Sequence, residues 1–213
     1  MTMRRSFRIS MIAAAAMLSL GALTLPSQGQ SGARPVYTAD GKMLQLPAGF
    51  ETWVFVGSNL GLSYLDEMTR NDSREANRAQ DRQFFHNVYI SPEAYAHFAA
   101  TKEFPDPTIL VMEVFVSEDR DPRGVLKSGV YNGEQVGLEV AVKDTHRPAG
   151  HLAPPAASPW AYYVFKDPFQ PPPVLRQAAA PDQTGFCQRC HKANAPPDNV
   201  WVRFYPALRK FMP

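Results

Sequence analysis

Two cysteines and a histidine near the end of the 213-residue sequence constrain its fold more than any other feature. They stand together in Phe186–His191, which reads FCQRCH and contains the pattern C-x-x-C-H. Two thiols three positions apart on one helical turn can each bond a haem vinyl group, and the adjacent imidazole can then reach the iron. The motif therefore predicts one covalently bound haem c, attached through Cys187 and Cys190 and ligated by His191.

Other uses of two cysteines fit the sequence less well. A zinc site needs about four ligands, and the chain has no further cysteine. A redox C-x-x-C pair normally opens a helix after an early strand. One disulfide is the ordinary use of two cysteines in an oxidising compartment, but the histidine directly after the second cysteine favours haem.

The late position of the motif excludes two common haem folds. Small electron-transfer cytochromes carry the motif near the N-terminus and take a second axial methionine from the C-terminal part, whereas this chain ends at Pro213, soon after the motif. The four-helix c′ cytochromes have a C-terminal motif, but their preceding chain is helical. Strand-like segments such as Thr108–Ser117, TILVMEVFVS, argue against that bundle.

The first residues have the layout of an export signal. Three arginines precede an apolar run and then small residues: Arg4, Arg5 and Arg8, then Ile9–Leu25, then Ser27 and Gly29. The run is shorter than the roughly 20 residues that span a bilayer. We expect residues 1–29 to be a cleaved signal peptide, residues 30–213 to be one haem c domain, and the protein to be periplasmic. Without the arginines the formal charge falls from +2 to −1, so no basic field for nucleic acid remains.

Hydrophobic patterning predicts about five strands and a few short helices. Thr108–Ser117 is apolar almost throughout, as a central strand covered on both faces should be. Ser91 as N-cap and Pro92 at the first helical position predict a helix that runs to about Thr101. The predicted strands are Glu51–Gly57, Phe84–Ile90, Thr108–Ser117, Gln135–Lys143 and Trp160–Lys166. This pattern indicates an α+β chain with a mostly antiparallel sheet.

Three regions lack regular patterning. Asn59–Asp81 is polar and predicts a loop or an exposed helix, and the proline-rich His146–Pro159 and Asp167–Pro173 predict breaks in regular structure. We expect the remaining histidines outside the strands, His97, His146 and His151, to face solvent.

Several stretches together resemble the cytochrome P-460 family, which includes the β-sheet form of cytochrome c′. They are ETWVFVG, VYISPEAYAHF, TILVMEVFV, YNGEQVGLEVAVKD, WAYYVF, CQRCHKANA and VRFYPALR. The resemblance implies an antiparallel-sheet homodimer and a five-coordinate haem whose open distal side binds small nitrogen species. Some members oxidise hydroxylamine and have a lysine cross-linked to the haem, whereas the β-sheet c′ relatives lack the cross-link and bind nitric oxide or carbon monoxide.

The sequence departs from the hydroxylamine-oxidising members at two positions. Matching the surrounding strand places the cross-linking lysine at Met112, whose thioether has no amine to form that bond. A distal arginine of those members is matched by His86. Lys102, Lys127 and Lys143 are the other lysines in this region, but none falls at the matching position. The resemblance therefore favours a haem without the cross-link.

Three residues are candidates for the distal side, each with a simpler structural alternative. Met112 is either a wall of the haem pocket, a sixth ligand, or core packing with Leu110 and Val114. His86 is either a distal donor or acid/base group, or a packing residue in its strand. Glu139 lies between small neighbours that leave space for a flat cofactor, where it is either a proton relay or an exposed strand charge.

These observations favour a protein that binds or detoxifies nitric oxide or related nitrogen oxides. A five-coordinate haem in an apolar pocket has a free site for neutral diatomic molecules. Two alternatives remain open: hydroxylamine oxidation, and low-spin electron transfer if a protein group supplies a sixth ligand. The expected partners are nitric oxide, carbon monoxide or hydroxylamine, a small electron-transfer cytochrome, and a second copy of the chain.

Overall fold

The computed structural model describes residues 32–62, 83–121, 123–151, 158–170 and 172–213. The predicted signal segment and most of the polar stretch 59–81 lie outside these residues, and the domain boundary at residue 30 stays a prediction. In the described part of the chain, no helix is both long enough and apolar enough to cross a membrane.

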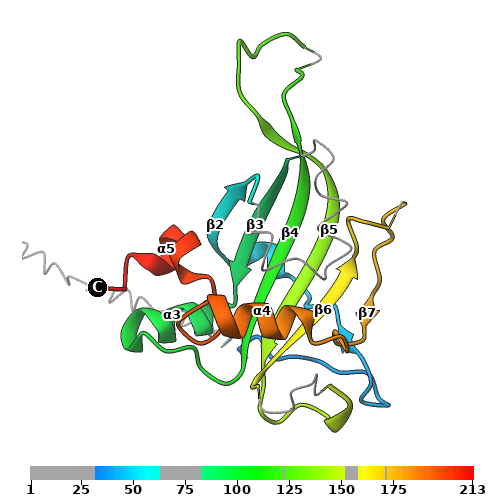
Figure 1. The fold of residues 1–213 in the computed structure, drawn as a ribbon, viewed down its shortest axis with the longest axis vertical. Helices are drawn as coiled ribbons and strands as arrows, with labels where there is room; N and C mark the ends of the chain where they lie inside the picture. Colours follow the sequence, from blue (N-terminus) through cyan, green and yellow to red (C-terminus); the bar gives the residue numbers. More distant parts are fainter. Residues whose placement is uncertain (1–31, 63–82, 122, 152–157, 171) are drawn as a thin grey trace, which may run out of the picture. The chain divides into compact units, whose positions relative to one another are not determined.

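A five-stranded antiparallel sheet lies at the centre of the described chain (Figure 1). Every strand pairs with the next one in the sequence. From one edge to the other the strands are β2 (Val54–Leu60), β3 (Phe84–Ile90), β4 (Thr108–Glu118), β5 (Tyr131–Lys143) and β6 (Trp160–Lys166). The predicted α+β class with a mostly antiparallel sheet is confirmed.

The strand bounds differ from prediction mainly where a turn intervenes. Strands β3 and β6 have the predicted bounds, whereas β5 begins at Tyr131, four residues before the predicted start. Strand β2 begins three residues late, because the left-handed Gly49 (φ 70°) leads into the 3-10 turn η1 (Phe50–Thr52). It then continues to Leu60, so the first two residues of the predicted loop belong to the sheet.

Strand β4 is the middle strand of the sheet, and both of its faces are buried where the strand begins. Successive side chains of a strand point to opposite faces. Leu110 and Val114 lie on one face, and Leu110 belongs to the first hydrophobic core, which also includes Val88. Ile109 and Val111 lie on the other face and belong to the second hydrophobic core, which also includes Phe165. Each fully buried aliphatic side chain contributes roughly 1.5–3 kcal/mol to folding, which explains why the run contains so few polar residues.

Helices and the C-terminal segment cover one face of the sheet. Figure 1 shows α4 lying across this face, and it contacts β6. The elements are α3 (Pro92–Thr101), α4 (Phe186–Asn194), the 3-10 turn η3 (Val202–Phe204) and α5 (Pro206–Arg209). Helix α3 has its predicted bounds with Ser91 at the N-cap, but the Ser91 side chain makes no capping hydrogen bond. Phe98 of α3 and Leu208 of α5 are fully buried in the first core.

The opposite face is covered by the N-terminal segment and by the chain after β6. Strands β1 (Leu44–Gln45) and β7 (Ala178–Ala179) pair with each other. Their residues Leu44 and Ala179 pack into the second core. These segments cover the second face of the sheet, whereas the helices and a cavity lie on the first face.

One prediction about the histidines is wrong. His97 and His146 are exposed as expected, but His151, in the 3-10 turn η2 (Ala149–His151), has no exposed surface. Its Nδ1 lies 2.9 Å from the Tyr163 hydroxyl and its Nε2 lies 2.7 Å from the Gly41 carbonyl. A carbonyl only accepts, so Nε2 carries the proton and Nδ1 accepts from the tyrosine.

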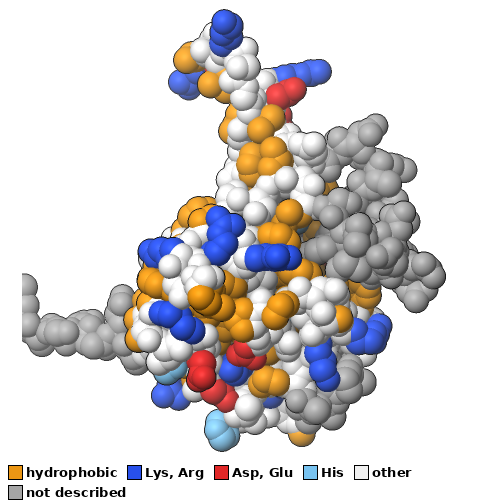
Figure 2. Space-filling view, turned by 60° about the vertical axis from the view of Figure 1, so that its left-hand side comes forward, with side chains coloured by type: hydrophobic (Ala, Val, Ile, Leu, Met, Phe, Trp, Pro, Cys, Tyr) orange, Lys and Arg blue, Asp and Glu red, His pale blue; other side chains and the backbone are white. Residues whose placement is uncertain are grey.

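The β4–β5 hairpin extends beyond the other strands (Figure 1). In its connection the Asp121 carboxylate accepts hydrogen bonds from the backbone N–H groups of Arg123, Val125 and Leu126. Val125 is 80% exposed, and Figure 2 shows basic and hydrophobic side chains together at this tip. The tip is thus an exposed surface held in shape by one carboxylate.

Candidate functional site

The two cysteines lie on helix α4, whose start is fixed by local hydrogen bonds. The Asp182 carboxylate accepts from the backbone N–H groups of Thr184 (3.0 Å) and Cys187 (3.2 Å), and the Thr184 hydroxyl accepts from the Phe186 N–H. Burial alone would raise the pKa of Asp182, but the Thr184 hydroxyl, which donates to this carboxylate at 2.6 Å, and the two backbone donors hold the pKa below its ordinary value. The helix therefore begins just before Cys187.

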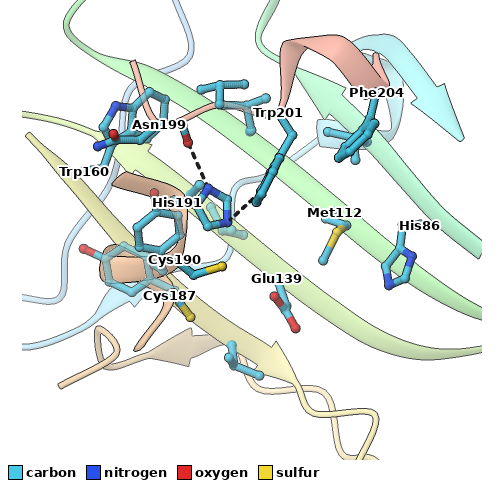
Figure 3. A pocket seen from close by; sticks show the side chains of 18 of the residues that line it. His86, Met112, Glu139, Trp160, Cys187, Cys190, His191, Asn199, Trp201 and Phe204 are labelled. Carbon is cyan, nitrogen blue, oxygen red and sulfur yellow. Dashed lines mark hydrogen bonds between the residues drawn. The ribbon is translucent and has the colours of Figure 1, made fainter. Parts of the chain in front are cut away.

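Neither thiol forms a disulfide, and both lie on the cavity side of α4. Figure 3 shows the sulfur atoms of Cys187 and Cys190 turned toward the space in front of the sheet. Residues three positions apart on a helix lie on the same face. The pair is thus presented to the cavity together, as the motif predicts.

His191 is held in one tautomer. Its Nδ1 lies 2.8 Å from the Asn199 carbonyl, which can only accept, so the Nδ1 hydrogen is donated and Nε2 keeps its lone pair. The Trp201 indole N–H donates to this Nε2 at 3.4 Å. Burial lowers the pKa of His191, although the bond to Asn199 acts in the opposite direction. The imidazole is therefore neutral and able to ligate a metal.

Aromatic rings enclose this imidazole. The Tyr162 ring lies 4.6 Å from the His191 ring and the Trp201 ring 5.7 Å from it, and Trp201 stacks on Phe204. Tyr162 comes from β6, whereas the other two follow α4 in the chain. These neighbours fix the imidazole plane through packing as well as through the hydrogen bond.

A cavity opens between the sheet and this C-terminal layer. The cavity volume is about 160 Å³, on the order of ten times what a single water molecule needs. The sheet supplies its floor, and α4 and the segment after it supply its opposite wall (Figure 3). The residues that line the cavity include Asn59, His86, Met112, Glu139, Tyr162 and Trp201.

All six site residues predicted from the sequence line this one cavity: His86, Met112, Glu139, Cys187, Cys190 and His191. Met112 of β4 is paired directly with Glu139 of β5. His86 lies on β3, two positions from Val88, which is the residue paired with Met112. The three side chains lie on the same sheet face, opposite α4 (Figure 3). Their position is a finding, whereas their roles stay predictions.

Sequence reasoning missed four residues of the site: Asn59, Tyr162, Asn199 and Trp201. Asn59 is paired with His86 across β2 and β3, so alternation in the two strands could have found it. Tyr162 shares the cavity face of β6 with Trp160. The other two follow the motif in a non-helical segment, for which sequence patterns give no direction.

Two of these missed residues carry buried polar atoms that make no hydrogen bond within the described chain. They are the Asn59 amide nitrogen and the Tyr162 hydroxyl. Buried polar atoms in proteins normally have partners. Since both residues line the cavity, these atoms fit a site that encloses another polar group.

Comparison with known proteins identifies the class. The family model Cytochrome P460 matches residues 47–202. The chain belongs to the cytochrome P460 family, and this membership implies a haem cofactor. No match was found among curated proteins.

The residues present fit such a group. Two thiols outside any disulfide and an imidazole whose Nε2 is unprotonated line one cavity, together with two buried polar atoms that make no hydrogen bond within the described residues. Cys187 and Cys190 would hold the porphyrin edge, and His191 would ligate the iron. The covalent links and the presence of a single haem remain part of the proposal below.

Proposed function

We propose that this chain is a periplasmic mono-haem c protein that binds or detoxifies nitric oxide or related small nitrogen oxides on an open distal side. The haem would supply an iron with one free coordination position for neutral diatomic ligands. The observation that carries the proposal is Met112, a thioether on the sheet face of the cavity where the resemblance places the cross-linking lysine.

The chain's own residues favour binding over turnover. Burial favours the neutral form of His191, and the bond from Nδ1 to the Asn199 carbonyl fixes the tautomer in which Nε2 would face the iron. Apolar residues such as Val88 and Leu110 line the sheet side of the cavity. An apolar wall excludes competing water and suits uncharged diatomic molecules.

Hydroxylamine oxidation is the second candidate, because His86 and Glu139 stand on either side of Met112 on the same sheet face. Oxidation of hydroxylamine releases protons, and an imidazole and a carboxylate at one site can accept them. The missing lysine at residue 112 counts against this function.

A low-spin electron-transfer cytochrome is the third candidate. It requires a sixth ligand from the protein, and Met112 is the residue on the distal side whose side chain is of a type that cytochromes use for this purpose. In that case the iron would have no free position for an external ligand.

Optical spectra of protein matured in a host with cytochrome c assembly would separate the three candidates. We expect a high-spin ferrous spectrum that changes on titration with nitric oxide. Sharp α and β bands without added ligand would indicate electron transfer instead. A strongly red-shifted ferrous Soret band together with turnover of hydroxylamine would overturn the proposal in favour of the oxidase.

The cellular setting and partners are also proposals. The N-terminal arginines and apolar run support export to the periplasm, where the family resemblance suggests a homodimer and a small electron-transfer cytochrome as redox partner. Fractionation of the host, sedimentation of the mature protein and reduction by a soluble cytochrome would test these three points separately.

A further inference from the structure

The carbonyl group that holds His191 comes from an unusual piece of backbone. Asp198 (φ 52°) and Asn199 (φ 61°) are consecutive non-glycine residues in the left-handed region. Aspartate and asparagine tolerate this region better than other non-glycine residues, usually as single residues. Two in succession persist only where surrounding contacts hold them, and the conformation sets where the Asn199 carbonyl points.

Three side-chain hydrogen bonds connect this turn to the end of the sheet, and two of them reach the Asp198 carboxylate. One carboxylate oxygen lies 2.6 Å from the Lys143 ammonium, and the other accepts from the Trp160 indole N–H at 3.2 Å. Lys143 also donates to the Phe104 carbonyl at 2.8 Å. The Asp198 carboxylate is thus hydrogen-bonded to the end of β5 and to the start of β6. The lysine is also hydrogen-bonded to the segment that precedes β4.

The pair is sheltered enough to act as a rigid link. The side chains of Lys143 and Asp198 are 17% and 29% exposed, and Trp160 is 1% exposed. Charge-assisted hydrogen bonds are shorter and stronger than neutral ones, and partial burial reduces their screening by salt. The sheet end and the left-handed turn are therefore joined at one carboxylate.

We propose that Lys143, together with Trp160, is a positioning residue for the axial histidine: by fixing Asp198 it aims the Asn199 carbonyl at His191 Nδ1. This inference rests on the proposed haem ligation by His191. An acceptor on Nδ1–H raises the basicity of the opposite ring nitrogen. A more basic Nε2 strengthens the iron–histidine bond and favours the ferric over the ferrous state, so Lys143 tunes the cofactor without touching it.

Lys143→Met in the haem-loaded protein is the principal test, with two readouts that do not depend on activity. Resonance Raman spectroscopy of the ferrous form reports the iron–histidine stretching frequency, and spectroelectrochemistry reports the midpoint potential. Loss of a supporting partner of a metal ligand commonly costs about tenfold or more in metal affinity. We expect the ferric preference to fall by up to about tenfold, an upward shift of up to about 59 mV for a one-electron couple, and a lower stretching frequency.

Three further variants sharpen the test. Lys143→Arg keeps a cationic donor and should restore both readouts toward those of the wild type. Asp198→Asn keeps a residue that tolerates the left-handed region but removes the charge, and it should shift both readouts in the same direction as Lys143→Met. Lys127→Met removes the same charge from the exposed hairpin tip and should leave both readouts unchanged.

The outcomes separate this inference from the proposed function. If the wild type carries haem but Lys143→Met and Asp198→Asn match it in stretching frequency and potential, with only a lower melting temperature, the ion pair is merely structural and the inference is wrong. If the wild type matured in a competent host carries no haem, the proposed function fails and the inference fails with it. Should Lys143→Met not accumulate, the Asp198→Asn and Lys143→Arg readings decide.

Discussion

Adding one methyl group at Gly57 should loosen the C-terminal wall of the cavity. Gly57 lies in β2, and a Cβ built on it would stand 3.0 Å from Cδ of Pro206, 3.2 Å from Cα of Tyr205 and 3.3 Å from the Phe204 carbonyl oxygen. Two of these three atoms belong to the backbone and cannot rotate away. Ordinary contact begins at about 3.4 Å, so the C-terminal segment must move outward in Gly57→Ala.

The cost follows from two opposing effects. Overpacking of a well-packed site costs typically about 1–3 kcal/mol, whereas replacing glycine by alanine inside a strand gains about 0.5–1 kcal/mol. We expect Gly57→Ala to lower the free energy of unfolding by about 1–2 kcal/mol. For a chain of this size that corresponds to a fall in melting temperature of roughly 2–8 °C.

Thermal and urea unfolding of the haem-loaded protein would measure this change. Ser58→Thr is the matched control, because it adds one methyl group at the neighbouring exposed position of the same strand and should stay within about 0.5 kcal/mol of the wild type. Since Phe204 and Tyr205 line the cavity, the ligand-binding rates should also change in Gly57→Ala. Equal stability of the two variants would refute the close approach of the C-terminal segment to β2.

Three other predictions address the site and the buried histidine. Cys187→Ser should leave the haem attached through one thioether at most. Mass spectrometry of the denatured protein should therefore show a smaller fraction of chains that carry the haem mass. Met112→Lys should place an amine in the cavity and red-shift the ferrous Soret band through cross-linking, whereas Met112→Leu should not; identical spectra for the two would contradict the placement of residue 112. Burial holds the pKa of His151 below its ordinary value, against the opposing effect of the Gly41 carbonyl, so the unfolded chain binds the proton first as pH falls. The free energy of unfolding should therefore decrease as pH drops below about 6.5, and urea titrations at pH 7 and pH 5 should show a smaller decrease in His151→Gln.

The strands were predictable because their side chains repeat with a period that reports the two faces of a sheet. The continuous apolar run from Thr108 indicated a central strand, as β4 is, and the alternation in Gln135–Lys143 indicated that the two faces of β5 differ; the order of the strands was not predicted. Pairing then explains why His86, Met112 and Glu139 reach one cavity. The start of β2 was missed, because a left-handed glycine set the turn before it.

The rest could not be predicted, because it depends on contacts between distant parts of the chain. The hydrogen-bond partners of the buried His151 are distant in the sequence: Gly41 is 110 residues away and Tyr163 is 12 residues away. Asn199 acts through its backbone carbonyl, which any residue type would supply. The Lys143–Asp198 pair spans 55 residues, and neither partner stands in a pattern that indicates the other.

The C-terminal wall has a practical consequence for recognising proteins of this kind. The two thiols and the imidazole all lie before residue 192, yet the acceptor for that imidazole and the indole beside it come from Asn199 and Trp201. A shortened chain that kept the C-x-x-C-H pattern but lost this wall could still attach a porphyrin, but it would lack the hydrogen bonds that orient the His191 imidazole. Counting such patterns in a genome therefore measures how many chains can be loaded, and says little about how many tune the metal they carry.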